Sequence, residues 1–313
     1  MNILLYMPGD DASSWLDEIA AALPSANMRA WTEGDTASAD YALVWKPTAE
    51  VLAGRQHLKA VFNLGAGVDA LLALLRVHPH LLPPEVPFIK LDDAGMASQM
   101  TQYVLHAVLR HFRRFDTYAD LQRENRWQPL AGRDASSHII GVMGLGALGT
   151  PVAKALAQLG FPVRGWSRRR RPVEQVASFA GPGELPAFLD DLNVLVNLLP
   201  LTAETENMLN REVFARLAPG AQLINIARGA HLVENDLLQA LDSGQLATAT
   251  LDVFREEPLP PQHPFWNDPR IHVTPHVAAQ TLRRESVRQI AERIGRLEQG
   301  LGVDGVIDVN RGY

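Results

Sequence analysis

A glycine-rich turn at residues 144–149 is the first stretch whose residue types and spacing indicate chemistry. Gly144, Gly146 and Gly149 form the pattern G-x-G-x-x-G, directly after the apolar run 139–143 and directly before a helix-forming run, 151–159. The first glycine permits a tight strand-to-helix turn, the second lets the backbone approach a pyrophosphate, and the third lets the helix pack on the strand. The helix N-terminus then presents N–H groups and a positive dipole to phosphates. Strand, turn and helix in this order predict dinucleotide binding rather than an ordinary βα turn.

Three further polar clusters each follow a short apolar run, where ligands bind in open α/β sheets. They are residues 225–229 with Arg228, residues 252–258 with three acids, and residues 274–278 with His276. Taken singly, each has a plainer interpretation: an ion-paired arginine, an exposed acidic loop in which no acid stands out, and a structural histidine. An arginine beside a cofactor site can also bind a carboxylate through its bidentate fork.

Together, the three clusters supply what hydride transfer to a 2-keto acid needs. The arginine orients the acid, the histidine gives a proton to the carbonyl oxygen, and a carboxylate keeps the histidine charged. His272 and His276 lie too far apart along one strand to share a metal, and the chain has no cysteine. We therefore expect no metal site.

The elements that must position these groups alternate between strands and helices. Six apolar runs predict the doubly wound parallel sheet of a Rossmann dinucleotide domain, at residues 139–143, 163–166, 194–198, 222–227, 248–253 and 271–274. Runs at 2–7, 41–45, 59–64 and 88–91 predict a smaller, flavodoxin-like α/β substrate domain. An amphipathic helix at 281–300 and an edge strand at 306–309 are expected to return to that domain. The expected domains are therefore 1–98 with 281–313, and an inserted 99–280.

Two other stretches have open interpretations. The glycine turn at residues 63–69 is either a plain βα loop or a set of backbone N–H groups able to hold an anion. Residues 98–123 predict one long helix, which is more than one domain needs and suits a domain bridge or a subunit contact.

Composition limits the function classes. The chain has 313 residues, of which 47% are hydrophobic and 20% charged, with a net charge of −6. These values are typical of a globular protein of about two domains and give no reason to expect nucleic acid or an anionic membrane as partner. Residues 1–7 are apolar but too short for a signal peptide, and no run is long enough to span a membrane. A cytoplasmic protein is expected.

The motifs at residues 144–149, 223–229, 251–260, 263–266 and 274–276 resemble, in this order and spacing, those of the D-isomer-specific 2-hydroxyacid dehydrogenases. The resemblance covers nearly the whole chain. Within the family, Trp45-Lys46-Pro47 and Arg311-Gly312-Tyr313 resemble the glyoxylate/hydroxypyruvate reductase A subfamily.

The resemblance implies roles for individual residues. Arg228, Glu257 and His276 would be the catalytic set, and a homodimer would form through the nucleotide-binding domains. The substrate would meet Trp45, Ala66, Gly67, Val68, Arg228 and His276. The cofactor would lie along Gly144, Leu145, Gly146, Ala147, Leu148, Gly149, Leu199, Pro200, Thr202, Ala227 and Asp252.

One departure from the family pattern concerns the cofactor. NAD-specific members carry an acid about twenty residues after the glycines, which binds the ribose 2′-hydroxyl. Here Ser167, Arg168 and Arg169 occupy that place. A hydroxyl and cations suit a 2′-phosphate, so NADPH is expected in preference to NADH.

The expected function is NADPH-dependent reduction of small 2-keto acids such as glyoxylate and hydroxypyruvate. One alternative is phosphoglycerate dehydrogenase, although many of those enzymes have a C-terminal regulatory domain for which a chain of 313 residues leaves no room. Another is a corepressor-like nicotinamide sensor, against which the set Arg228, Glu257 and His276 argues. Formate dehydrogenase would not keep histidine and glutamate in these roles.

Overall fold

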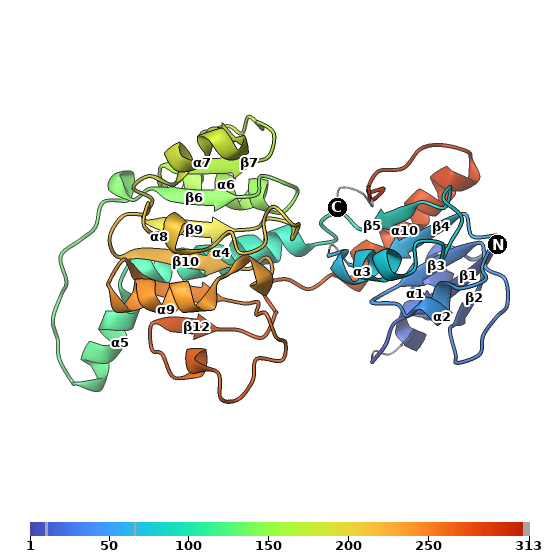
Figure 1. Cartoon of the computed structure of the whole chain (residues 1–313), viewed down its shortest axis with the longest axis horizontal. Coiled ribbons are helices and arrows are strands. Elements are labelled where there is room, and N and C mark those ends of the chain that lie inside the picture. The colour runs from blue at the N-terminus through green and yellow to red at the C-terminus, as the bar shows by residue number, and fades with distance from the viewer. Residues whose placement is uncertain (10–11, 66, 309–313) are drawn as a thin grey trace. The chain divides into compact units, whose positions relative to one another are not determined.

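The computed structural model describes residues 1–9, 12–65 and 67–308. The chain divides into two compact units (Figure 1). Unit 1 comprises Met1–Gly95 and Thr281–Tyr313, and unit 2 comprises Met96–Gln280. The first crossing therefore lies three residues before the end of the expected first domain at 98. The roles expected for these two parts of the chain remain predictions.

Unit 2 is built on a parallel sheet in the order β12-β11-β10-β9-β6-β7-β8. Its strands are β6 (Ile140–Met143), β7 (Val163–Ser167), β8 (Val176–Ala180), β9 (Val194–Asn197), β10 (Ala221–Asn225), β11 (Leu246–Leu251) and β12 (Ile271–Val273). The chain winds outward from β6 in one direction and from β9 in the other. This is the doubly wound dinucleotide-binding topology, and its switch point lies between β6 and β9.

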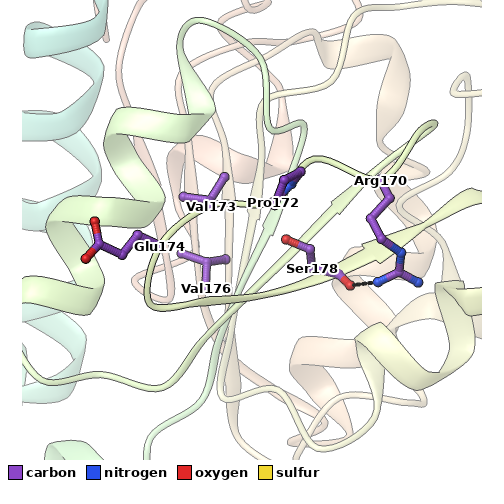
Figure 2. Close-up of a pocket in the computed structure, with 6 residues that line it drawn as sticks. All are labelled: Arg170, Pro172, Val173, Glu174, Val176 and Ser178. Carbon is purple, nitrogen blue, oxygen red and sulfur yellow. Dashed lines mark hydrogen bonds between the residues drawn. The ribbon is translucent and has the colours of Figure 1, made fainter.

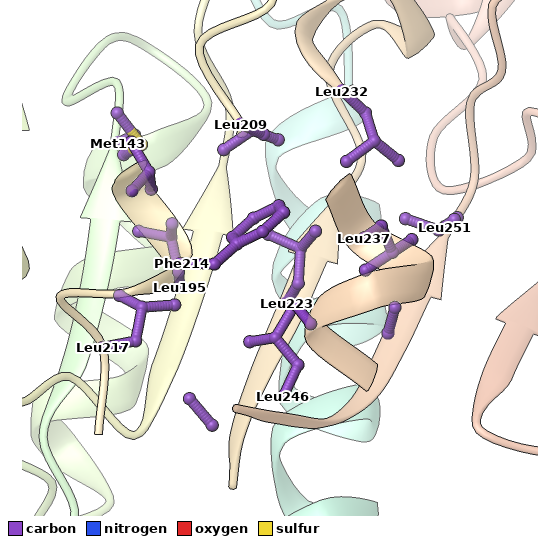
Figure 3. Packing of buried hydrophobic residues seen from close by; sticks show 14 of the residues in the cluster. Met143, Leu195, Leu209, Phe214, Leu217, Leu223, Leu232, Leu237, Leu246 and Leu251 are labelled. Atoms are coloured by element: carbon purple, nitrogen blue, oxygen red, sulfur yellow. The ribbon is translucent and has the colours of Figure 1, made fainter. Parts of the chain in front are cut away.

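Helices cover both faces of this sheet, because alternate residues of a strand point to opposite sides. Val194 and Val196 of β9 face the cluster that α4 (Met96–Phe112) and α6 (Gly149–Gln158) complete. Leu195 faces the other cluster, shown in part in Figure 3, where Phe214 packs among leucines of neighbouring strands. That side carries α7 (Gly181–Leu189), α8 (Arg211–Phe214) and α9 (Glu234–Asp242). The remaining elements of unit 2 are α5 (Phe115–Arg123), η1 (Ala135–Ser137), η2 (Gly229–His231) and η3 (Pro264–Trp266).

Unit 1 has a five-stranded parallel sheet in the order β2-β1-β3-β4-β5, the flavodoxin-like order. Its strands are β1 (Asn2–Tyr6), β2 (Asn27–Ala30), β3 (Tyr41–Val44), β4 (Ala60–Asn63) and β5 (Phe88–Lys90). Its helices are α1 (Ala12–Ala22), α2 (Ala49–Leu52), α3 (Asp69–Val77) and α10 (Arg283–Glu298). Val306 forms a single antiparallel bridge to Ile89, so the expected returning edge is one bridge within the described part of the chain.

Two strands were missing from the sequence prediction, and both lie at sheet edges. β8 makes the unit 2 sheet seven-stranded rather than six-stranded, and β2 is the edge of the unit 1 sheet. Only one of the five residues of β8 is buried, and none of the four residues of β2. An edge strand that faces solvent needs no continuous apolar run. β2 reads NMRA, and in β8, which reads VASFA, Ser178 interrupts the apolar residues.

The prediction of one continuous helix over residues 98–123 is wrong. α4 ends at Phe112 and α5 begins at Phe115, and between them Arg114 adopts a left-handed conformation with φ of 56°. No glycine or proline marks this turn, and apolar residues continue on both sides of it. Periodicity alone therefore could not locate the break.

Candidate active site

The glycine turn follows β6 at the switch point and is shaped by close backbone contacts. Gly144 has φ of +102°, and a Cβ there would lie 2.8 Å from the carbonyl oxygen of Leu198, at the end of β9. A Cβ on Gly149 would lie 1.9 Å from the carbonyl oxygen of Gly144, so α6 can begin this close to the turn only from a glycine. Gly146 is exposed, with no atom within 4 Å of a Cβ position. Its backbone is therefore open to a ligand.

The other residues of this turn differ in what they can offer. Leu145 is 1% exposed and its side chain packs against Gly165 of β7, so only its backbone can take part in binding. Ala147 is exposed and Leu148 is half-buried. The open backbone at Gly146 and the N-terminus of α6 fit the pyrophosphate of a dinucleotide.

The arginine-rich turn follows β7. Ser167 is half-buried and its Oγ donates to the carbonyl oxygen of Arg169 at 2.7 Å, while Arg168 and Arg169 are exposed. The next arginine, Arg170, donates to the carbonyl oxygen of Ser178 and forms an ion pair with Glu184. Figure 2 shows Arg170 among the residues that line a pocket, together with Pro172, Val173, Glu174, Val176 and Ser178. These contacts bind Arg170 to β8 and α7. Arg168 and Arg169 are exposed and directly follow Ser167, the last residue of β7.

Arg228 lies on the loop after β10. Its Nη1 donates to the carbonyl oxygen of Ala227 at 2.6 Å, and its own carbonyl oxygen accepts from Asn225 Nδ2 at 3.0 Å. A Cβ on Gly229 would lie 1.9 Å from the carbonyl carbon of Phe254. The loop that carries Arg228 therefore packs directly on the loop that leads to Glu257.

Glu257 and His276 form a hydrogen-bonded pair. Glu257 Oε2 lies 2.8 Å from His276 Nδ1, and Glu257 Oε1 accepts from the backbone N–H of Phe254 at 3.0 Å. Burial raises the pKa of Glu257, but the hydrogen bonds from His276 and Phe254 and the charges of His276 and Arg228 outweigh it. The net pKa lies below the usual value, so Glu257 is an anion beside the imidazole. His276 is 47% exposed and can meet a ligand.

Asp252 organises the loop that carries His276. Asp252 is 1% exposed. Its carboxylate accepts from Thr274 Oγ1 at 2.6 Å and from the N–H groups of Val277 and Ala278, each at 2.8 Å. The backbone N–H of His276 donates to the Asp252 carbonyl oxygen at 2.8 Å. The sequence predicts a place along the cofactor for Asp252, and these hydrogen bonds add a role in holding this loop.

The loop after β9 carries the other residues expected along the cofactor. Leu199 is 8% exposed, and its N–H donates to Asn197 Oδ1 at 3.2 Å. Pro200 is exposed and Thr202 is half-buried. This loop and the glycine turn lie on the two sides of the switch point, where cofactors bind in this topology.

In unit 1, the residues expected to bind substrate follow two neighbouring strands. Trp45 follows β3, and its ring covers Gly65, where a Cβ would lie 2.2 Å from it. Asn63 Nδ2 donates to the carbonyl oxygens of Gly65 and Gly67 at 2.7 and 3.0 Å, and so shapes the turn after β4. Val68 is 5% exposed, which leaves its backbone as the part able to bind a ligand. Ala66 lies outside the described residues, as do Arg311, Gly312 and Tyr313.

Comparisons with known proteins agree with this geometry. Residues 105–278 match the family described as D-isomer specific 2-hydroxyacid dehydrogenase, NAD binding domain. The chain is 54% identical to glyoxylate/hydroxypyruvate reductase A of Serratia proteamaculans, with all of both chains covered. The chain belongs to the D-isomer-specific 2-hydroxyacid dehydrogenases. The family predicted from the motifs is therefore confirmed, and so is its dinucleotide fold.

Solved structures of this dehydrogenase family are similar over the whole chain. A family member from Xanthobacter autotrophicus, in complex with NADPH and MES, has a TM-score of 0.92 and 42% identity, with 100% of this chain and 99% of that chain covered. An NADPH-dependent glyoxylate/hydroxypyruvate reductase from Sinorhizobium meliloti, in complex with NADP and sulfate, has a TM-score of 0.91 and 35% identity, with all of both chains covered. This dehydrogenase is therefore an enzyme with a nicotinamide dinucleotide domain.

In the part of the chain that the structure describes, no helix is both long and apolar enough to cross a membrane. Within the same residues, no group of three or more histidine or acidic side chains is placed to hold a metal ion.

Proposed function

We propose that this chain reduces small 2-keto acids, glyoxylate and hydroxypyruvate, to the corresponding 2-hydroxy acids, with NADPH as the preferred cofactor. The observation that carries the proposal is the Glu257–His276 pair at 2.8 Å, with Glu257 on a loop that packs against the one that carries Arg228. Relatives named glyoxylate/hydroxypyruvate reductase A, at 54% and 50% identity over their full length, support the substrate class.

The mechanism assigns one task to each of three residues. Arg228 binds the substrate carboxylate through paired N–H groups and so orients the carbonyl. His276 gives its proton to the carbonyl oxygen as the carbonyl carbon becomes tetrahedral. Glu257 holds the imidazole by Nδ1, which leaves Nε2 as the donor. The reduced nicotinamide, when bound, supplies the hydride that the carbonyl carbon accepts. The products are the 2-hydroxy acid, the oxidised cofactor and a neutral histidine.

The proposed NADPH preference rests on the turn after β7. Arg168 and Arg169 are exposed there, and no acid follows β7 directly. Charge-assisted bonds contribute roughly 1.5–3 kcal/mol each, so one bond to a 2′-phosphate gives about a tenfold preference or more. Two similar structures that hold NADPH or NADP support the assignment. The remaining cofactor contacts are proposed at Gly144–Gly149, Ser167, Leu199, Pro200, Thr202, Ala227 and Asp252.

The proposed preference for small acids rests on the turns of unit 1. Trp45 covers Gly65 and stands beside the turn that contains Gly67 and Val68. A bulky indole and a closed turn leave little room for a large substituent on the keto carbon. Phenylpyruvate should therefore be a poor substrate.

The test is a panel of 2-keto acids assayed with NADPH and NADH. Glyoxylate and hydroxypyruvate should have a higher kcat/KM than phenylpyruvate, and NADPH should be preferred.

His276→Ala should lower kcat by about 10²–10⁴-fold while cofactor affinity stays nearly unchanged. Arg168→Asp should lose most of the NADPH preference through a higher KM. Equal turnover of phenylpyruvate, or a preference for NADH in the wild type, would contradict the respective part of the proposal.

We also propose that two copies associate through unit 2. Large apolar side chains are exposed on and after α5, with Phe115 at 53% and Trp127 at 100% exposure. A protein interface would cover such exposed apolar side chains. Light scattering should give twice the chain mass, and a monomer would contradict this part. The cytoplasmic location remains a prediction.

A further inference from the structure

We propose that His231 is a positioning residue that fixes Arg228 through the backbone. This inference rests on the proposed function, because it takes Arg228 as the group that binds the substrate carboxylate. His231 closes η2, three residues after Arg228, and was not singled out by any motif in the sequence. It is 0% exposed, so its ring makes its contacts inside the protein.

The imidazole lies between two carbonyl oxygens of different loops. Its Nδ1 is 3.1 Å from the carbonyl oxygen of Arg228, and its Nε2 is 3.3 Å from the carbonyl oxygen of Pro200. Carbonyl oxygens only accept hydrogen bonds, so the imidazole binds them by donating. A protonated imidazole donates to both, and a neutral one, which has a single N–H, donates to one of them. His231 therefore stands between the loop after β10, which carries Arg228, and the loop after β9.

A second link between the same loops runs through two buried asparagines, each 0% exposed. Asn225 Nδ2 donates to the carbonyl oxygen of Arg228 at 3.0 Å, and Asn197 Nδ2 donates to Asn225 Oδ1 at 3.0 Å. Asn197 Oδ1 in turn accepts from the N–H of Leu199 at 3.2 Å. Since Leu199 precedes Pro200, the hydrogen bonds and the chain form a closed ring.

This closed ring of contacts fixes the backbone from which the Arg228 side chain extends. Two side chains approach the carbonyl oxygen of Arg228, those of Asn225 and His231, and the backbone N–H of His231 also donates to it at 3.3 Å. Displacing a positioning group by about 1 Å can cost about 10²-fold in rate. An unpaired buried polar group also has a cost, so the ring has one favoured arrangement. His231 is the member of the ring that can be changed without altering β9 or β10.

Two substitutions separate hydrogen bonding from space filling. His231→Leu places an apolar side chain of similar size at this position, and this side chain donates to neither carbonyl. His231→Gln has an amide nitrogen with two N–H groups, so it can still donate to the backbone. We expect the leucine variant to raise the KM for glyoxylate and the Kd for oxalate about tenfold, and the glutamine variant to restore most of both. Oxalate, a carboxylate probe, is titrated calorimetrically with NADP⁺ present, so the reading does not depend on turnover.

A double-mutant cycle with Arg228→Lys tests whether His231 acts through Arg228. If it does, His231→Leu should cost much less in the Arg228→Lys background than in the wild type. Additive losses would overturn the inference. If the leucine variant does not fold, the cycle is run with His231→Asn, whose shorter side chain cannot span both carbonyls, and additivity is again the refuting result.

The matched control is His138→Leu, which removes another buried imidazole of unit 2. His138 precedes β6, packs against Phe112 and Phe161, and has no hydrogen-bond partner for Nε2 among the described residues. We expect its KM and oxalate Kd to match the wild type. An Arg228→Lys variant with unchanged oxalate affinity would contradict the proposed function. A clear Arg228→Lys effect without coupling to His231 would overturn only the present inference.

Discussion

Replacing Asp252 by asparagine tests how the loop that carries His276 is held. The three groups that approach the Asp252 carboxylate all donate: Thr274 Oγ1, Val277 N and Ala278 N. Asparagine has nearly the same shape but only one acceptor oxygen. If that oxygen replaces Oδ1, the new NH₂ group faces the N–H of Ala278. If it replaces Oδ2, the NH₂ group faces the N–H of Val277. In either orientation, one backbone N–H loses its acceptor.

The expected loss follows from these contacts. A hydrogen bond to a charged group contributes about 1.5–3 kcal/mol, and a buried donor left unpaired costs about 1–3 kcal/mol. These two energies overlap, because both count part of the same lost contact. We therefore expect the free energy of unfolding to fall by about 2–4 kcal/mol. Because His276 lies on the loosened segment, kcat should also fall, by about 10²-fold for a displacement near 1 Å.

Asp268→Asn is the matched control, since the Asp268 carboxylate also accepts three hydrogen bonds, all from Arg270, at 2.7–2.9 Å. Urea unfolding and steady-state kinetics are measured on both variants. Both should lose stability, but only Asp252→Asn should lose kcat. If Asp252→Asn keeps the wild-type stability and kcat and raises only the KM for the cofactor, the carboxylate serves the cofactor and not the loop. Our account of the loop would then be wrong.

Three other predictions concern Glu257, Arg228 and two buried histidines. Glu257→Gln removes the anion beside the imidazole, so kcat/KM for reduction should fall while the KM for the cofactor stays nearly unchanged; a wild-type kcat/KM would contradict this role. Arg228→Lys keeps the charge but not the fork, and should raise the KM for glyoxylate about tenfold or more. An unchanged KM would contradict the bidentate contact and show that a point charge suffices. Burial lowers the pKa of His111 and of His138 to about 4. The unfolded chain therefore binds protons that the native chain does not, and the free energy of unfolding should fall as the pH falls from about 6.5 to about 4. Urea titrations at each pH measure this free energy, and a value that does not change between these pH limits would refute the prediction.

How far the fold could be predicted depended on burial. The central strands of both sheets, such as β9 and β4, have every residue buried and appear in the sequence as apolar runs. The edge strands β2 and β8 are mostly solvent-accessible, so backbone pairing rather than side-chain burial holds them in the sheet. Pairing uses N–H and C=O groups that every residue except proline has, and it leaves little trace in a sequence.

The site divides in a similar way. Residues proposed to touch a ligand have distinctive chemistry at strand ends, so Arg228, His276 and the glycines of the turn could be proposed from type and spacing. Residues that hold those groups in place, such as His231 and Asn197, act through backbone carbonyl and N–H groups of segments far apart in the chain. Their partners are set by which strands become neighbours: Asn197 reaches Asn225 because β9 and β10 pair in register there. Once the strand order is known, a buried polar side chain at the carboxyl end of a strand has to find a partner on the next loop. The positioning of Arg228 is thus a consequence of sheet topology, and it can be tested only by variants that separate a hydrogen bond from the space it fills.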